Sequence, residues 1–442
     1  MTFVNIFLLE WKHFFRSPYK VIAIFLFIVA SVYGIHNGVI LYQTHTNEIA
    51  KIEQRVSEER QEFLKKHLEK DLSTKQKNNS RDYTSPYWAL RQFSLYHFKK
   101  PSPSIVYSIG QSEQFGFYKK ITFNSSPYDN DLSEEIANPE RLQIGTFDFS
   151  FALLFLLPLV LMILVFNIKS TEIEQGFISL IKVQVISKNA WIIARVGFYF
   201  FLALFISYGL ILYGSLLMTN LQPIKTAMVS MMLYTFFYIL FWSTLFLFII
   251  IKNKNLLSII LQMSFSFILF AFVIPGIVHQ LLSINYPVNL MTNLIDVRDQ
   301  RQELYGQPHD AINSQLKIIY PQIENSPIID DSLKVKSALS QSIPALVNSL
   351  KKNNIGFVEN EIQSKIEFVN KFNIINPIVF FQNKINAVSE THYDNYQTYR
   401  NEIQFLIDKQ IEVLIEDIWS RKTVDENRYR EYTKIFTINN GS

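Results

Sequence analysis

Two carboxylates stand two residues apart in a polar segment between hydrophobic runs. Glu172 and Glu174 precede Gly176, and the apolar stretch 177–181 follows. Glycine can end one helix or start a turn, so the pattern predicts a short amphipathic helix that lies on a bilayer or docks in a partner's groove. The segment therefore favours recognition. The alternative is a pair of carboxylates that are merely solvated beside a membrane.

The sequence lacks the motifs of the common catalytic sites. No G-x-x-x-x-G-K-[ST] occurs among its 13 glycines, so any ATP must be bound by another subunit. H-E-x-x-H and G-x-S-x-G are absent, and no two of the eight histidines stand three or four residues apart. With no cysteine, the chain has no thiolate metal site, cysteine nucleophile or disulfide. We expect no enzymatic activity, no cofactor and no metal in this chain.

Three polar side chains and two prolines interrupt the hydrophobic runs. His36 and Asn37 lie near the end of the first run and His279 lies in the last. Polar groups at membrane depth usually face a bundle interior or a cavity, so these three are candidates for a substrate pathway, with a structural role as the alternative. Pro158 and Pro275 each sit inside a run. Proline kinks a helix, so each marks either a packing kink or a gating hinge.

The composition is that of a membrane protein. Of the 442 residues, 49% are hydrophobic and 18% are charged, whereas soluble domains have about 25% charged residues. A net charge of +4 is too weak to favour nucleic-acid binding. Five runs are long enough to cross a bilayer core, which takes roughly 20 apolar residues. We therefore expect an α-helical polytopic membrane protein with five transmembrane helices, at 21–42, 147–168, 196–224, 225–251 and 255–285.

Lysine and arginine in the short flanks indicate the orientation of these helices. Basic residues gather in 1–20, in 169–195 and between the fourth and fifth helices, whereas the turn between the third and fourth carries only Lys225. We expect the N-terminus in the cytoplasm, with an interfacial helix within residues 1–20. The segments 43–146 and 286–442 then form two extracytoplasmic domains of α or α+β type.

The two external segments differ in pattern. Residues 44–81 are amphipathic, which predicts a helical stalk that packs on its own domain or, as the alternative, a coiled-coil surface for a partner. Residues 82–138 are rich in aromatics and proline and predict short strands and loops. The C-terminal segment is mostly helical by pattern and contains no further run long enough to span. Its best candidate, 372–383, carries Pro377 and is expected in a protein core.

The order of these parts resembles the membrane subunit of type-2 ABC transporters, within the subfamily that has large external domains after the first and fifth spans. The resemblance covers nearly the whole chain. The matching residues are Leu9-Glu10-Trp11-Lys12, Arg16-Ser17, Asn138-Pro139, Gly145, Phe147-Asp148-Phe149, Leu157-Pro158-Leu159 and Glu172-x-Glu174-Gln175-Gly176. Members commonly have Gly-Thr-Leu where this chain has Gly176-Phe177-Ile178, and they commonly end with a sixth span, which we do not find here.

The resemblance implies a permease subunit, of exporter type, that moves or extracts an unidentified substrate at the bacterial inner membrane. A separate dimer of ABC ATPase subunits would drive it, a second permease chain would complete the path, and membrane lipid would surround both. The residues that would contact the ATPase are Glu172, Glu174 and Gly176 of a coupling helix, with Glu10 and Arg16 as a second contact. The alternative is a membrane-anchored binding or assembly protein whose external domains hold a partner and which transports nothing.

Overall fold

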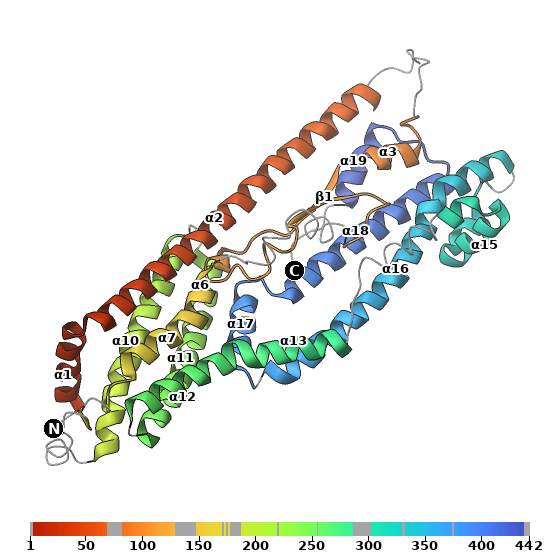
Figure 1. The fold of residues 1–442 in the computed structure, drawn as a ribbon. Helices are drawn as coiled ribbons and strands as arrows, with labels where there is room; N and C mark the ends of the chain where they lie inside the picture. The colour runs from red at the N-terminus through yellow and green to blue at the C-terminus, as the bar shows by residue number, and fades with distance from the viewer. Residues whose placement is uncertain are drawn as a thin grey trace.

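The structure is a computed structural model that describes residues 3–68, 82–128, 147–169, 172–173, 176, 187–218, 221–253, 255–285, 302–328, 332–373 and 375–436. This part of the chain is mostly helical. It consists of a bundle of apolar helices and a more polar lobe at one end of that bundle (Figure 1). The lobe comprises the C-terminal half of the long helix α2 together with residues 82–128 and 302–436.

The bundle is built mainly from long apolar helices. In chain order it contains α1 (Phe3–Arg16), α2 (Pro18–Phe63), α6 (Phe149–Phe151), the π-helical turn η3 (Ala152–Leu156), α7 (Leu157–Val165), α10 (Lys188–Leu216), α11 (Leu221–Lys252), α12 (Leu256–Ile268), the π-helical turn η4 (Leu269–Val273) and α13 (Ile274–Asn285). Within the described residues, four helices are long and apolar enough to cross a membrane: Pro18–Lys66, Asn189–Leu216, Ile224–Lys252 and Leu256–Asn285. A fifth, Phe149–Val165, is apolar but shorter. These helices are what a helical membrane protein requires.

Three boundaries of the third and fourth apolar helices differ from those predicted by the charge pattern. α10 begins at Lys188 rather than at Val196, because the polar residues before the apolar run continue the same helix. α10 ends at Leu216 and α11 begins at Leu221, so Lys225 lies inside α11 and not between two helices. Pro223 stands in the first turn of α11, where a missing N–H removes no helical hydrogen bond.

The lobe is helical around one small hairpin. Its elements are η1 (Leu64–Leu68), α3 (Pro86–Gln92), β1 (Leu95–Phe98), the 3-10 turn η2 (Pro103–Val106), β2 (Tyr118–Ile121), α15 (His309–Ile319), the 3-10 turn η5 (Pro321–Asn325), α16 (Ser332–Asn373), α17 (Pro377–Val388), α18 (Tyr393–Trp419) and α19 (Glu426–Ile435). β1 and β2 pair antiparallel, with Leu95 opposite Ile121. One face of α18 is buried in the lobe core through Ile403, Leu406, Ile407, Ile411 and Leu414.

The lobe core also closes around the ends of two helices. α2 leaves the bundle without a break, and its last residue, Phe63, is buried in the lobe core together with Leu64 of η1, which favours a stalk that packs on its own domain. α19 is held to α18 by the fully buried Asp417, whose carboxylate accepts bonds from Arg428 at 2.6 and 3.0 Å and from the Tyr432 hydroxyl at 2.7 Å.

Two glycines of α2 let the lobe end of the bundle pack closely. A Cβ on Gly34 would lie 2.4 Å from the carbonyl carbon of Asp148, and one on Gly38 would lie 2.8 Å from the Cα of Val106. The absence of a side chain therefore allows α6 and η2 to rest directly on the α2 backbone.

α17 is a lobe helix whose buried face belongs to the bundle. Ile378, Phe381 and Ile385 are buried among bundle side chains, and Figure 1 shows α17 at the end of the bundle that faces the lobe. The stretch predicted at 372–383 to be part of a core thus includes the end of α16 and the first half of α17.

Candidate functional site

Charged side chains gather at the end of the bundle that carries α1. Arg195 of α10 is 8% exposed, and its guanidinium forms ion pairs with Glu10 of α1 and Glu172 of the segment after α7. Its Nη1 also donates to the carbonyl of Ile168 at 2.9 Å, and the Trp191 ring lies against it, 4.7 Å from the guanidinium carbon. Three segments that are far apart in the sequence therefore meet on one guanidinium.

The burial of these charges fixes their partners. Glu10 is 2% exposed, and a buried carboxylate is tolerated when it is paired and hydrogen-bonded. A guanidinium presents several N–H donors in a rigid fork, so it can hold two carboxylates at once. Burial raises the pKa of Glu172, although the Arg195 guanidinium acts in the opposite direction.

Glu10 lies inside the protein. It was predicted as part of a second contact for an ATPase, and its carboxylate is buried and paired with Arg195. Glu172 is half-buried on the same guanidinium. The structure thus brings these two predicted residues together.

Lys20 forms a second tie at the same end of the bundle. It lies in the first turn of α2 and is 3% exposed. Its Nζ donates to the carbonyl of Leu164 at 2.7 Å and to the hydroxyl of Tyr199 at 2.9 Å. α2, α7 and α10 are joined by this one ammonium group.

Lys169 forms a third tie, at the C-terminus of α11. Its Nζ donates to the carbonyls of Ile250 and Ile251, both at 2.8 Å, and to that of Asn253. The first two carbonyls belong to the last turn of α11 and the third follows it directly, where partners within the helix are missing and a cation is favourable. In the sequence, Lys20, Lys169 and Arg195 stand out only as flanking charges, because burial depends on neighbours that a single sequence does not reveal.

The remaining residues predicted to contact an ATPase are less closely tied. Arg16 is exposed at the end of α1. Gly176 has a φ of +75°, the left-handed conformation that glycine adopts most readily, and a Cβ there would meet open space. Glu174 and the predicted amphipathic stretch 177–181 lie outside the described residues.

The three polar residues predicted for a pathway lie toward the lobe end and do not form one site. His36 is exposed, with its Nε2 2.9 Å from the Tyr213 hydroxyl. Asn37 donates to the carbonyl of Phe147 at 2.8 Å. His279 is exposed on α13. The first two tie α2 to its neighbours, which is the structural alternative for these residues.

Pro158 follows a π-helical turn in the shortest apolar helix. It is buried near the start of α7, directly after η3. Proline cannot bond to the carbonyl four residues before it, which here is Leu154. The hydroxyl of the fully buried Tyr238 of α11 donates to that carbonyl. At this kink, formed by η3 and Pro158, the carbonyl therefore receives its hydrogen bond from a side chain of another helix.

Pro275 stands in a similar arrangement in the last apolar helix, with the carbonyl that receives a side-chain donor one residue farther back. It follows the π-helical turn η4, in which bonds run from an N–H to the carbonyl five residues earlier. Pro275 has no N–H to donate to the carbonyl of Phe270, five residues before it. This carbonyl accepts a bond of 2.8 Å from the side-chain amide of Asn376 instead. Both prolines were predicted from the sequence as kinks or hinges, whereas neither donor was.

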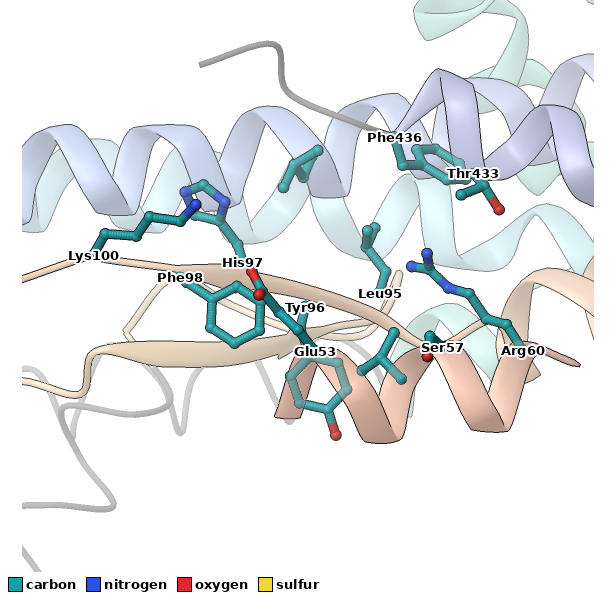
Figure 2. A pocket seen from close by; sticks show the side chains of 12 residues that line it. Glu53, Ser57, Arg60, Leu95, Tyr96, His97, Phe98, Lys100, Thr433 and Phe436 are labelled. Carbon is teal, nitrogen blue, oxygen red and sulfur yellow. The ribbon is translucent and has the colours of Figure 1, made fainter. Parts of the chain in front are cut away.

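The lobe contains a groove between α2, β1, α18 and α19, with a volume of about 350 Å³ (Figure 2). Its polar lining includes Arg60, His97 and Lys100. Arg60 donates to the carbonyl of Ser94 at 2.9 Å, and His97 lies 2.7 Å from a carboxylate oxygen of Glu402. Two of the three basic groups are thus already used by the lobe itself.

No protein-family model, curated protein or solved structure matches the chain. The ionic cluster around Arg195, the two proline kinks and the lobe groove are the features from which a function can be inferred.

Proposed function

We propose that this chain is the permease subunit of an ABC transporter in the bacterial inner membrane. Five helices would cross the membrane, with the Arg195 end in the cytoplasm and the lobe outside. The helix Phe149–Val165 is at the lower limit of the roughly 17 to 25 residues that a span takes. Support for this orientation comes from the basic residues Lys20, Lys169 and Arg195 at one end of the bundle and the described parts of both polar segments at the other.

The observation that carries the proposal is the double ion pair on Arg195. A partner that binds the segment containing Glu172 would act on α10 directly and on α1 through Glu10, because all three share one buried guanidinium. Removing one partner of a buried ion pair costs about 3–5 kcal/mol, so the three segments are expected to move together. This is the property that a site for coupling to an ATPase requires.

ATP would be bound and hydrolysed by the ATPase dimer, and this chain would couple rather than catalyse, with no cofactor of its own. Coupling requires that the ATP-bound ATPase bind one conformation of the helices more tightly than the other. A second permease chain would face this one across the transport path. Membrane lipid would cover the exposed apolar side chains of the helices, such as Phe205 and Phe265.

Co-purification tests the proposal. The full chain is expressed in its native host and extracted in mild detergent, and the P-loop ATPase retained with it is quantified by its ATP hydrolysis. We expect retention by the wild-type chain and its loss when Glu172→Arg and Glu174→Arg are combined. Glu361→Arg, on the exposed surface of α16 in the lobe, is the control that should retain the ATPase.

Gel filtration of each variant separates a lost contact from a lost fold. Absence of the ATPase from the wild-type chain, or its undiminished retention by a monodisperse double variant, would overturn the proposal.

The groove of Figure 2 favours the second candidate, a membrane-anchored binding or assembly protein, because it is an open cavity of about 350 Å³ in the lobe. That candidate predicts no retained ATPase with any variant.

A further inference from the structure

α17 is joined to the lobe by the chain and to the bundle by packing. It is preceded by α16 and followed by α18, both of which contribute to the lobe core. Its own buried residues Ile378, Phe381 and Ile385 lie in the bundle core. A helix with this placement experiences the movement of both parts.

The first end of α17 holds the kink at Pro275. Asn376 is 2% exposed, and its Oδ1 accepts bonds from the backbone N–H groups of Ile378 at 3.0 Å and Val379 at 3.4 Å. Its amide nitrogen donates to the carbonyl of Phe270 at 2.8 Å. The side chain that begins α17 is thus also the partner of the carbonyl that Pro275 leaves free.

The middle of α17 rests on the side chain that completes the other kink. The Phe381 ring meets the Tyr238 ring edge to face, with centroids 5.2 Å apart. The Tyr238 hydroxyl donates to the carbonyl of Leu154, four residues before Pro158, where an α-helical turn would place the N–H that proline lacks. α17 therefore packs against Tyr238, the donor at η3, and is capped at its first end by Asn376, the donor at η4.

The last turn of α17 is tied to the start of the helix that contains Pro158. The Oδ1 of Asn386 accepts a bond of 2.6 Å from the Ser108 hydroxyl, which also lies 3.3 Å from Asp148. Asp148 accepts bonds from the N–H groups of Ile109 at 2.9 Å and Phe151 at 2.7 Å, and the second of these caps α6. α17 is thereby fixed at both ends and in the middle.

We propose that α17 is the link that couples the two kinked helices to each other and to the lobe. A backbone carbonyl left unpaired in apolar surroundings costs about 1–3 kcal/mol, so each kink retains its donor. One donor is carried by α17 and the other is packed against it. A change of bend at either kink therefore displaces α17, and with it the lobe and the other kink. This inference goes beyond the proposed function, because it requires neither an ATPase nor transport.

Distances across the η4 kink test the link, with the perturbation placed at the η3 kink. The chain has no cysteine, so Leu261→Cys and Ile277→Cys, both exposed and on opposite sides of η4, introduce a single pair of spin labels into the full-length protein in lipid nanodiscs. Pulsed electron paramagnetic resonance then gives the distribution of distances between the labels. We expect a narrow distribution in the otherwise wild-type chain.

Tyr238→Phe and Phe381→Leu should each broaden this distribution, although neither residue belongs to α12, η4 or α13. Asn376→Asp retains the oxygen that caps α17 and loses the donor to Phe270, so it should broaden the distribution directly. The matched control is Tyr208→Phe, which removes a hydroxyl that donates to the carbonyl of Met232 at 3.1 Å, between α10 and α11. It should leave the distribution unchanged.

The outcomes distinguish the link from a local effect. Broadening by Asn376→Asp but not by Tyr238→Phe or Phe381→Leu would overturn the coupling between the kinks. An unchanged distribution with Asn376→Asp would also overturn the proposal, because the kink would then be held without α17. If Phe381→Leu does not elute as one species, Tyr238→Phe decides, since it removes a single oxygen atom.

Discussion

The side-chain amide of Asn376 occupies the hydrogen-bonding position opposite Pro275, at the carbonyl of Phe270 five residues earlier in the chain. In a π-helical turn that carbonyl would accept from the backbone N–H that proline lacks. The Tyr238 hydroxyl likewise donates a hydrogen bond to the carbonyl of Leu154, four residues before Pro158. At both kinks a backbone carbonyl therefore receives its hydrogen bond from a side chain that is distant in the sequence. Loss of the packing that holds this side chain in place is expected to destabilise the kink.

The Tyr238 hydroxyl can be tested against the proline whose loss it compensates. Tyr238→Phe is expected to lower the free energy of unfolding by about 1–3 kcal/mol, because it leaves the buried carbonyl of Leu154 without a partner. In a Pro158→Ala background the backbone supplies an N–H to the same carbonyl, so the loss should be smaller. Denaturant unfolding of the full chain in detergent micelles measures all four corners of this cycle.

An equal loss in both backgrounds would show that the hydroxyl and the proline act independently. Pro158→Ala alone is the control for the straightened helix, and circular dichroism should show that its helix content is retained.

Removal of the Arg195 guanidinium should destabilise the end of the bundle that carries α1. Arg195→Ala leaves the buried carboxylate of Glu10 and the half-buried carboxylate of Glu172 without their shared partner, which is expected to cost about 3–5 kcal/mol. Arg195→Lys should recover part of this loss, because an ammonium keeps the charge and loses the fork that reaches both carboxylates. The measurement is the same unfolding free energy.

The matched control is an exposed pair elsewhere in the chain. Arg430→Ala breaks the pair between Arg430 and Glu426 on the surface of α19, where an i,i+4 pair contributes about 0.3–0.5 kcal/mol. If Arg195→Ala were no more costly than this control, the ion pairs on Arg195 would not hold the three segments together.

The sequence predicted the apolar helices because a run without charge is a local property. It misplaced the turn at Lys225 because a single lysine at the start of a helix resembles one in a loop, whereas Pro223 in the first turn is compatible with a helix that begins at Leu221. It placed the stretch around Pro377 in a core but could not say that this core belongs to the bundle.

The residues of the candidate site were predictable only in part. Glu10 and Glu172 were predicted as contacts, whereas Arg195 stood out only as a charge beside a hydrophobic run, and their meeting depends on how α1 and α10 pack. The prolines were visible for the same local reason. Their donors were not, because a tyrosine within an apolar run and an asparagine before a proline have no pattern that identifies a distant carbonyl as their acceptor.

Close packing of α2 on α6 should make Gly34 intolerant of a side chain. Gly34→Ala would bring a Cβ to 2.4 Å from the carbonyl carbon of Asp148, so the two backbones must separate. We expect a lower thermal unfolding temperature in detergent. Gly197→Ala is the control, since a Cβ there meets open space in the middle of α10 and alanine favours a helix by up to about 1 kcal/mol over glycine.

A Gly34→Ala chain as stable as the Gly197→Ala chain would show that α6 is not held against α2 at this point. Gly34→Leu would then be the stronger test, because its longer side chain cannot be accommodated by a small shift of the backbone.

The stability of the lobe should depend on pH through His97. This side chain is 8% exposed, and burial lowers its pKa below the ordinary value of 6.5, although Glu402 acts in the opposite direction. The unfolded chain then binds more protons than the folded one between the two pKa values, so stability falls as pH decreases. The contribution is fully present above about pH 6.5 and is lost as the pH falls from there through the pKa of the folded state.

Thermal unfolding of the full chain, followed at neutral pH and near pH 5, should show a smaller shift of the unfolding temperature for His97→Gln, whose amide can still donate to Glu402. An identical shift in both proteins would mean that His97 does not control the acid sensitivity of the lobe, and that groups elsewhere in the chain do.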